Sequence, residues 1–257
     1  MTDNPNSRLA CFEQWGGNRK AEFPVELPGL VGWISSAPLD PEAGGGDVYY
    51  LSVCSKGMVS RIALADVSGH GPSANAVAET LREKLRAHTD NWDQSLLMRE
   101  LSDAFHEGQT RGRFATAAVL GFYVETSELL FTNAGHPPAL WYRPSQPAWD
   151  FLQENTRFAE DVQDLPLGLI QGTTYSQTAV HLGPGDLLVL YTDGITETRN
   201  GAGQELGTKG LLELASRTPA GMPAEFGQAL LAKVQEFRGA AHHRDDETLV
   251  VLKRLAS

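Results

Sequence analysis

Residues 44–71 read GGGDVYYLSVCSKGMVSRIALADVSGHG. Two short apolar runs in this stretch, Val48–Val53 and Met58–Ala65, are separated by the four residues Cys54–Gly57. A loop of this length that contains a glycine is typical of a β-hairpin. Asp47 begins the first run, behind three glycines, and Asp66 ends the second. The stretch therefore predicts a pair of strands, each with an aspartate at one of its ends.

The order of the other predicted elements follows from hydrophobic periodicity. Apolar residues recur at helical spacing after Pro72 and again from Leu97 to Phe105, and the unbroken apolar run Leu187–Tyr191 is typical of a strand buried on both faces. Further strands are expected at Thr116–Val124, Leu129–Thr132, Ala139–Arg143, Tyr175–His181 and Thr248–Leu252, and further helices at Leu211–Arg217 and Pro223–Phe237. This order lacks the alternation of a parallel sheet, so it predicts an α+β fold with helices layered on mainly antiparallel sheets.

The chain shows no linker or internal repeat that would divide it. Its 257 residues suffice for one large domain or two small ones. The first 25 residues are polar, with little to pack. We therefore predict a loose N-terminal arm over residues 1–25 and one domain over residues 26–254.

The sequence predicts a cytoplasmic protein. No apolar stretch approaches the ~20 residues that a membrane span needs, and Met1–Lys20 lacks the apolar core of a signal peptide. The two cysteines, Cys11 and Cys54, fit a reducing compartment in which thiols stay free.

The formal net charge of −11 argues against nucleic acid and anionic membranes as partners. Two interpretations of the acidity remain. The carboxylates could form a solvated surface that keeps the protein in solution. Alternatively, some of them could cluster around hard cations, which prefer oxygen ligands.

Four aspartates stand at the ends of predicted strands. Asp47 begins one, Asp66 ends another, Asp193 follows Leu187–Tyr191 after one threonine, and Asp246 lies just before the last strand. Taken singly, each could be an ordinary strand-end residue. Together at one rim of the sheets they would repel one another strongly, unless divalent cations such as Mg²⁺ or Mn²⁺ lay between them.

Five short motifs give the chain a resemblance to a known family. It resembles the PP2C-type phosphatases of the bacterial RsbU/SpoIIE branch over about residues 30 to 253, and the five motifs occur in the family's order. They are Gly45-Gly46-Asp47-Val48-Tyr49, Ala65-Asp66-Val67-Ser68-Gly69-His70-Gly71, Asn133-Ala134-Gly135-His136-Pro137-Pro138, Tyr191-Thr192-Asp193-Gly194-Ile195-Thr196-Glu197 and Asp245-Asp246-Glu247-Thr248.

The resemblance implies a β-sandwich flanked by pairs of antiparallel helices, with two divalent cations at one end. By motif match, Asp66 would bridge both ions, and Asp193 and Asp246 would complete the coordination of one ion. The backbone carbonyl of Val67 would complete the other, which Asp47 would hold directly or through water. The four aspartates are therefore the predicted catalytic residues.

The aspartate beside Asp246 is an alternative ligand. Asp245 and Asp246 are adjacent, and we prefer Asp246 because the position directly before the Glu-Thr pair matches the family ligand.

The resemblance also implies an activity and a partner. A cation-activated water would hydrolyse phosphoserine or phosphothreonine on a protein, typically a small STAS-domain anti-sigma-factor antagonist. Regulation would come from a separate partner, from the N-terminal arm or from movement of the helices between Pro72 and Gln109. The alternatives are a module of this fold that binds a phosphoprotein without cleaving it, and a metal-dependent phosphodiesterase acting on a small molecule.

The residue that grips the phosphate is left open. Eukaryotic relatives place an arginine before the first aspartate, but here that region reads Pro41-Glu42-Ala43-Gly44. Arg113 and Arg244 are the candidates in its place.

Four other side chains have weaker assignments. His70 is a candidate acid for the leaving group or a loop-shaping residue, and His136 is expected in a structural turn. His242 and His243 are adjacent, and neighbours on a strand do not share a face, so we do not expect them to bind a metal together.

Overall fold

The computed structural model describes residues 12–54, 57–68, 81–86, 93–107, 114–152 and 164–256. Within these ranges the strands form two six-stranded sheets. Every strand pairing in them is antiparallel.

The first sheet is built around the predicted hairpin. Opposite residues pair in register along it, with Tyr49 facing Leu64 and Leu51 facing Ile62. Its strands, in spatial order, are β1 (Phe12–Gly16), β4 (Asp47–Cys54), β5 (Val59–Val67), β6 (Ala115–Tyr123), β7 (Glu128–Ala134) and β10 (Thr178–His181).

The second sheet has the chain's last strand near its middle. Leu187–Tyr191 is fully buried, as its unbroken apolar run predicts. The strands, in spatial order, are β2 (Ala21–Leu27), β3 (Leu30–Ala37), β12 (Glu247–Arg254), β11 (Leu187–Tyr191), β8 (Leu140–Arg143) and β9 (Ala148–Phe151).

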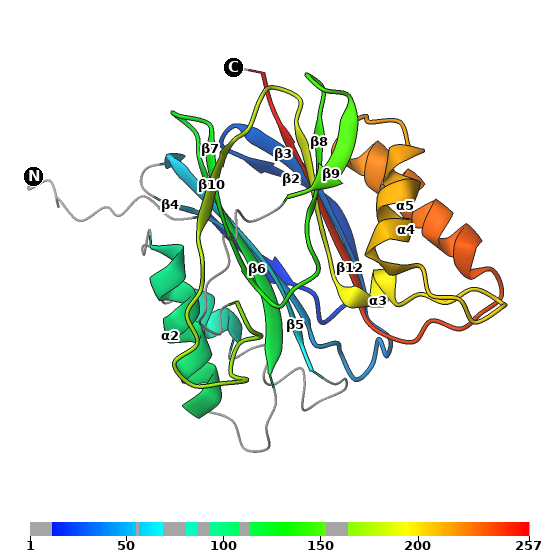
Figure 1. Cartoon of the computed structure of the whole chain (residues 1–257), viewed down its shortest axis with the longest axis horizontal. Coiled ribbons are helices and arrows are strands. Elements are labelled where there is room, and N and C mark those ends of the chain that lie inside the picture. The colour runs from blue at the N-terminus through cyan, green and yellow to red at the C-terminus, as the bar shows by residue number, and fades with distance from the viewer. Residues whose placement is uncertain are drawn as a thin grey trace, which may run out of the picture.

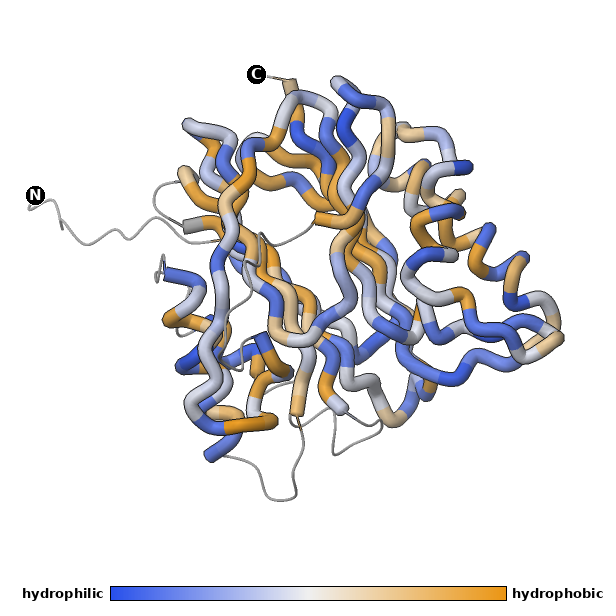
Figure 2. Tube along the Cα trace, viewed as in Figure 1, coloured by the Kyte–Doolittle hydropathy of each residue, from blue (hydrophilic) through white to orange (hydrophobic). Residues whose placement is uncertain are grey.

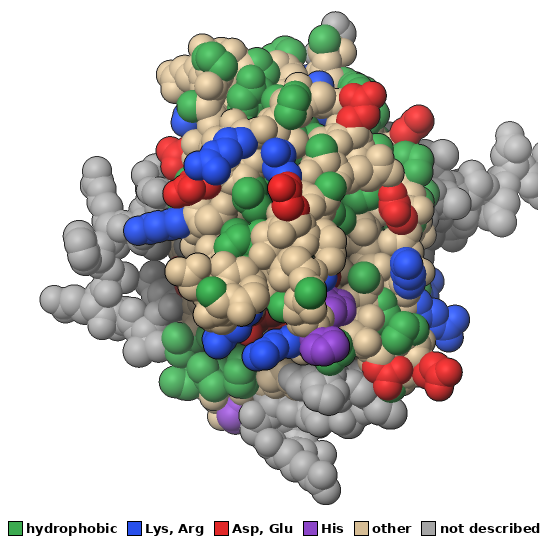
Figure 3. Space-filling model, turned by 90° about the vertical axis from the view of Figure 1, so that its right-hand side faces the viewer, with side chains coloured by type: hydrophobic (Ala, Val, Ile, Leu, Met, Phe, Trp, Pro, Cys, Tyr) green, Lys and Arg blue, Asp and Glu red, His purple; other side chains and the backbone are tan. Residues whose placement is uncertain are grey.

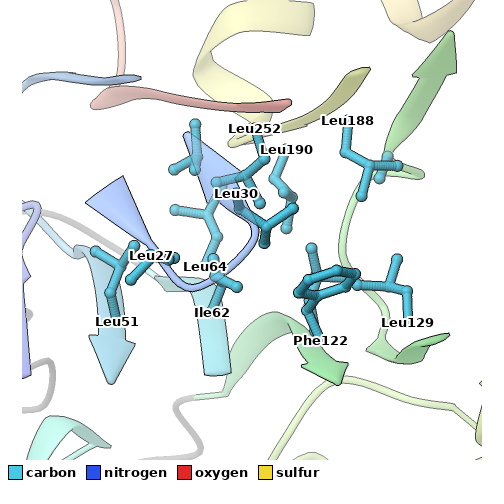
Figure 4. Close-up of a cluster of buried hydrophobic side chains, with 14 of the residues drawn as sticks. Leu27, Leu30, Leu51, Ile62, Leu64, Phe122, Leu129, Leu188, Leu190 and Leu252 are labelled. Carbon is cyan, nitrogen blue, oxygen red and sulfur yellow. The ribbon is translucent and has the colours of Figure 1, made fainter. Parts of the chain in front are cut away.

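The two sheets pack face to face over the main hydrophobic core. Leu51, Ile62 and Leu64 of the first sheet share this core with Leu190 and Leu252 of the second. Figure 4 shows these side chains pointing toward one another between the strands. Figure 2 shows hydrophobic residues gathered along the strands in the middle of the molecule. The alternation of side chains along β4 and β5 explains this, because every second residue faces the other sheet.

Helices cover the outer face of each sheet (Figure 1). The helix α2 (Gln94–Glu107) and the helical residues 81–86 share a second core with the outward side chains of β4, β5 and β6. The helices α4 (Gly207–Ser216) and α5 (Pro223–Arg238) share a third core with the second sheet. The order of layers is therefore helix, sheet, sheet, helix, and the predicted α+β sandwich is confirmed.

The face that α5 buries follows from its sequence. Phe226, Leu230 and Val234 recur every four residues and are all buried. Pro223 occupies the first turn, where a missing N–H costs nothing. Phe226 stacks on Trp149 of β9, with ring centroids 4.8 Å apart.

The loose packing predicted for residues 1–25 is wrong for two segments. Phe12–Gly16 forms β1 against β4, and Ala21–Leu27 forms β2 against β3. Both are edge strands, so the backbone of a neighbouring strand supplies their hydrogen bonds and they need few apolar residues. Where the domain begins along the chain stays a prediction.

Two further strands had not been predicted. In β3, the polar pair Ser35-Ser36 interrupts the apolar pattern, and β9 is only four residues long. Among the described residues, no helix is long and apolar enough to cross a membrane. The cytoplasmic location stays a prediction.

A stability experiment tests the outer helix layer. Phe226→Ala should lower the free energy of unfolding by about 3–4 kcal/mol, because the side chain is 1% exposed and leaves a cavity against Trp149. Phe237→Ala, on the same helix but only partly buried, is the matched control and should cost about half as much or less. Urea denaturation measures both, and equal losses would contradict this packing.

Candidate metal centre

Two of the predicted acids face each other across the hairpin. Asp47 at the start of β4 is the register partner of Asp66 near the end of β5. The antiparallel pairing therefore places both carboxylates at the same rim of the first sheet. Asp47 is only 1% exposed, whereas Asp66 is partly exposed.

The other two acids come from the second sheet. Asp193 follows β11 and begins the short helix α3 (Asp193–Thr196), and Asp246 directly precedes β12. Tyr191 pairs with Leu249 in antiparallel register, so both acids leave the sheet at the same end. The Asp66 and Asp193 carboxyl groups lie close enough for each to act on the pKa of the other.

Thr192 links the two sheets at this rim. Its hydroxyl donates to Asp47 Oδ2 over 2.9 Å and accepts a hydrogen bond from the backbone N–H of Thr248 over 2.9 Å. A hydroxyl can do both at once because it carries one donor and two lone pairs. Thr192 is fully buried, so both bonds are shielded from water.

Asp246 is fixed by the segment that leads into β4. Its Oδ2 accepts the N–H of Gly46 over 2.6 Å, and its Oδ1 accepts the N–H of Leu39 over 2.7 Å. Close approach explains two of the neighbouring glycines. A Cβ on Gly45 would lie 2.6 Å from Asp246 Oδ2, and one on Gly194 would overlap the Asp246 backbone oxygen.

Burial and crowding raise the pKa values of these carboxyl groups. Burial, followed by repulsion from Asp66, raises the pKa of Asp47 well above its usual value. Burial, followed by the charges of Asp193 and Asp245, raises the pKa of Asp66 to about 8. Burial and then the charge of Asp245 raise the pKa of Asp193 to about 6. The rim therefore gathers more negative charge than the protein itself compensates.

The oxygen donors at this rim suit a divalent cation, although they are not arranged around one point. Across the described ranges, no three His, Cys, Asp or Glu side chains are set to hold a single ion. Asp47 Oδ1 is buried and accepts no hydrogen bond from any described group. A carboxylate oxygen has two lone pairs, so Asp246 can bind a cation while it accepts its backbone hydrogen bonds. Oxygen donors of this kind fit Mg²⁺ or Mn²⁺.

The structure thus brings the four predicted aspartates to one rim. Val67 ends β5 beside Asp66, and its N–H donates to Gly46 O over 3.2 Å. Asp245 belongs to the same cluster, since its charge acts on both Asp66 and Asp193. The individual ligand roles, including the choice of Asp246 over Asp245, stay predictions.

Thr192 and Thr248 are the site residues that the sequence interpretation missed. Both lie inside two of the five motifs that carry the acids. Neighbouring residues give no signal for this role, because the Thr192 hydroxyl donates to Asp47, 145 positions away in the sequence.

His136 shapes a turn at the same end of the first sheet. Its N–H donates to Asn133 Oδ1 over 2.7 Å, and the Asn133 amide donates to His136 O over 2.9 Å. Its ring Nδ1 lies 2.9 Å from Thr116 Oγ1, and Thr116 is the register partner of Asp66. His70 and Arg113 lie outside the described residues.

Comparison with known proteins assigns the chain to a family. The profile of the family described as Stage II sporulation protein E (SpoIIE) matches residues 57–255. The chain belongs to the SpoIIE family. The resemblance predicted from the five motifs is therefore confirmed.

This SpoIIE-family chain has relatives among characterised proteins and solved structures. It is 28% identical to "Phosphoserine phosphatase RsbU" of Bacillus subtilis (strain 168) over 209 residues, which cover 80% of this chain and 58% of RsbU. The crystal structure of the RsbU and RsbW domains of Rv1364c from Mycobacterium tuberculosis matches with a TM-score of 0.73 and 25% identity. That match covers 93% of this chain and 63% of the other.

A third match shows the fold alone. The catalytic domain of the serine threonine protein phosphatase PstP, solved in complex with 2 manganese ions, gives a TM-score of 0.58 at 16% identity. It covers 88% of this chain and 99% of the PstP chain. The SpoIIE-family chain therefore has the PP2C fold, and it spans less than two thirds of the length of RsbU.

The Thr192 link can be tested by an isosteric change. Thr192→Val should lower the free energy of unfolding by about 2–4 kcal/mol, because it leaves Asp47 Oδ2 and the Thr248 N–H buried without their partner. The control is Thr126→Val, whose hydroxyl bonds Glu128 at an exposed turn and which should cost about 0.5 kcal/mol or less. A Thr192→Val protein as stable as the control would refute the link.

The buried histidine predicts a pH dependence. Burial lowers the pKa of His136 to about 3 from 6.5, and a backbone group of Tyr191 offsets part of this shift. Between these values the unfolded chain binds a proton that the folded chain does not, so stability is present above pH 6.5 and is lost as the pH falls.

His136→Gln should remove roughly 1 kcal/mol per pH unit of this slope. Unfolding free energies measured between about pH 4 and about pH 7 would show it. Parallel curves for the two proteins would contradict a neutral, buried imidazole.

Proposed function

We propose that this SpoIIE-family chain hydrolyses phosphoserine or phosphothreonine on a protein, with two divalent cations, Mn²⁺ or Mg²⁺, as cofactors. The observation that carries the proposal is the convergence of four aspartates, from both sheets, at one rim. The names of two relatives support it, because RsbU is a phosphoserine phosphatase and PstP is a serine threonine protein phosphatase that binds manganese.

The residues that would hold the cations are those that the motifs indicate. The register pairing of Asp66 with Asp47 and the action of the Asp193 charge on Asp66 support a bridging role for Asp66. Asp246 would complete the coordination of one ion, and the Val67 carbonyl would complete that of the other. When bound, the cations would activate a water for attack on phosphorus and would neutralise charge on the phosphoryl oxygens.

The protein's own contribution is to orient these carboxylates before a substrate arrives. Thr192 fixes Asp47, and the backbone N–H groups of Gly46 and Leu39 fix Asp246. Ligands held in this way need little rearrangement during the reaction, which is how enzymes stabilise transition-state charge at low cost. The glycines packed against Asp246 allow the loops to approach this closely.

The substrate that we propose is a phosphorylated STAS-type anti-sigma-factor antagonist. RsbU is the relative that suggests it, and the structure of Rv1364c contains RsbU and RsbW domains in one chain. A separate partner protein would regulate the reaction in the cytoplasm.

Two other functions fit the site less well. A module that only binds phosphoproteins would have no use for a crowded carboxylate cluster, since uncompensated charge at the rim costs stability. A phosphodiesterase acting on a small molecule has no support from the names of RsbU and PstP, both of which are phosphatases. It would cleave bis-p-nitrophenyl phosphate in preference to a phosphoprotein.

The central experiment replaces the proposed bridging ligand. Asp66→Asn should lower the release of phosphate from p-nitrophenyl phosphate and from a phosphorylated STAS protein by about 10³-fold or more, because it loses several kcal/mol of cation-dependent stabilisation. Asp150→Asn, at an exposed position of β9, is the control and should retain full activity. An Asp66→Asn protein as active as this control would end the proposal.

Removal of metal gives a second, independent result. Full chelation should abolish phosphate release by the wild-type chain, and added Mn²⁺ should restore it. Added Mn²⁺ should not restore phosphate release by the Asp66→Asn variant. Mn²⁺ should also raise the melting temperature of the wild-type chain, because a ligand that binds only the folded state stabilises it. Activity that survives chelation would be incompatible with the proposed cofactors.

A further inference from the structure

A cavity of about 200 Å³ opens beside the carboxylate rim. Gly194 and Asp245, next to two of the proposed metal ligands, form its side nearest the rim. Its other lining residues come from the segment after α3, from the end of α5 and from the loop before β12. We call it the side cavity. The cavity therefore adjoins the place where the phosphorylated residue of a protein substrate would lie under the proposed function.

The inner wall of the side cavity is built around a buried arginine. Arg238, at the end of α5, is 8% exposed and forms an ion pair with Glu247. It also donates to Thr198 Oγ1 over 3.1 Å and to Gln235 Oε1 over 3.0 Å. Because Glu247 compensates its charge, Arg238 fixes the shape of the wall rather than supplying free positive charge.

The outer part of the side cavity carries the available positive charge. Arg244 is exposed and forms no ion pair with the residues that the structure describes. Arg199 pairs with Glu205 over 3.0 Å, but both side chains are nearly half exposed, so that pair is weak. Figure 3 shows Lys or Arg side chains and His side chains gathered around a hollow on this face.

The acidic residues of the side cavity lie toward the rim. The charges of Asp245 and Glu197 both act on Asp193. The lining therefore combines an acidic side, formed by the two acids that act on Asp193, with a basic side, formed by the exposed Arg244 and Arg199. The basic side attracts a negatively charged ligand group, whereas the acidic side repels it.

We propose that the side cavity binds an acidic side chain of the phosphoprotein substrate, a few residues from the phosphorylated one, with Arg244 as its main contact. This inference rests on the proposed phosphatase function. The carboxylate centre takes the reacting phosphate, so the group in the side cavity is a second anion of the same substrate. An extended chain advances about 3.3 Å per residue, which lets an Asp or Glu within about four residues reach it.

The test uses phosphoserine peptides that carry Glu, Gln or Lys at each position within about four residues of the phosphoserine. At one or more positions, the wild-type chain with Mn²⁺ should show a higher kcat/KM for Glu than for Gln. Arg244→Ala should reduce this Glu-to-Gln ratio about fivefold. Arg244→Glu should invert the preference toward the Lys peptide, which a purely structural role of Arg244 would not produce.

Arg217→Ala is the matched control. Arg217 is an exposed arginine that pairs with Glu213 and does not line the side cavity, so its removal should leave the Glu-to-Gln ratio unchanged. The inference is overturned if the wild-type chain has no Glu preference, or if Arg244→Ala keeps the wild-type ratio. It is also overturned if Arg244→Ala lowers kcat/KM equally for all peptides and for p-nitrophenyl phosphate, which would make Arg244 a contact of the reacting phosphate.

Failure of the proposed function would be recognisable separately. A wild-type chain that releases phosphate from no substrate would refute the phosphatase, and the affinities of fluorescently labelled Glu and Gln peptides would then decide the inference. The same fivefold change in ratio is expected in fluorescence anisotropy. The inference would be overturned if the wild-type chain bound the Glu and Gln peptides with equal affinity, or if Arg244→Ala kept the wild-type ratio of the two affinities.

Discussion

The repulsion between carboxylates gathered at one rim of the sandwich is the constraint on which the rest of the site depends. Asp47 and Asp66 face each other across one hairpin, and the charge of Asp193 acts on Asp66 from the other sheet. Charges this close are costly in a buried position unless donors or cations offset them. Thr192 and the N–H of Gly46 supply part of that compensation from the protein itself. Divalent cations are the chemically suitable source of the remainder.

The sandwich is what allows this concentration of charge. Sheets that pack face to face bury their middles and leave the strand ends at two rims, where loops can vary without disturbing the core. At the site rim, β4, β5, β11 and β12 each end or begin beside an acid. The helices on the outer faces hold the sheets from behind through their own hydrophobic cores. The burial of apolar side chains in three cores thus offsets the cost of the charged rim.

The side cavity extends the same electrostatic pattern beyond the reaction centre. Its acids act on Asp193 at the rim, and its exposed arginines, Arg244 and Arg199, line the same cavity, so charges of both signs lie close together. A peptide with a phosphate and a nearby carboxylate would match cations at the rim and Arg244 beyond it. Such complementarity contributes more to the choice of partner and to association rate than to affinity. This would let one PP2C fold serve different phosphoproteins through changes in a single loop.

The sequence by itself determined the hairpin, the order of most elements, the α+β class and the four aspartates at strand ends. Each of these depends on local periodicity or on a short motif, which are properties of neighbouring residues. Tertiary structure alone decided that Phe12–Gly16 and Ala21–Leu27 are strands, because their hydrogen bonds come from β4 and β3. It likewise decided the bond from Thr192 to Asp47, which joins residues 145 positions apart. The cavity wall at Arg238 arises in the same way, because an ion pair with Glu247 exists only once α5 lies against β12.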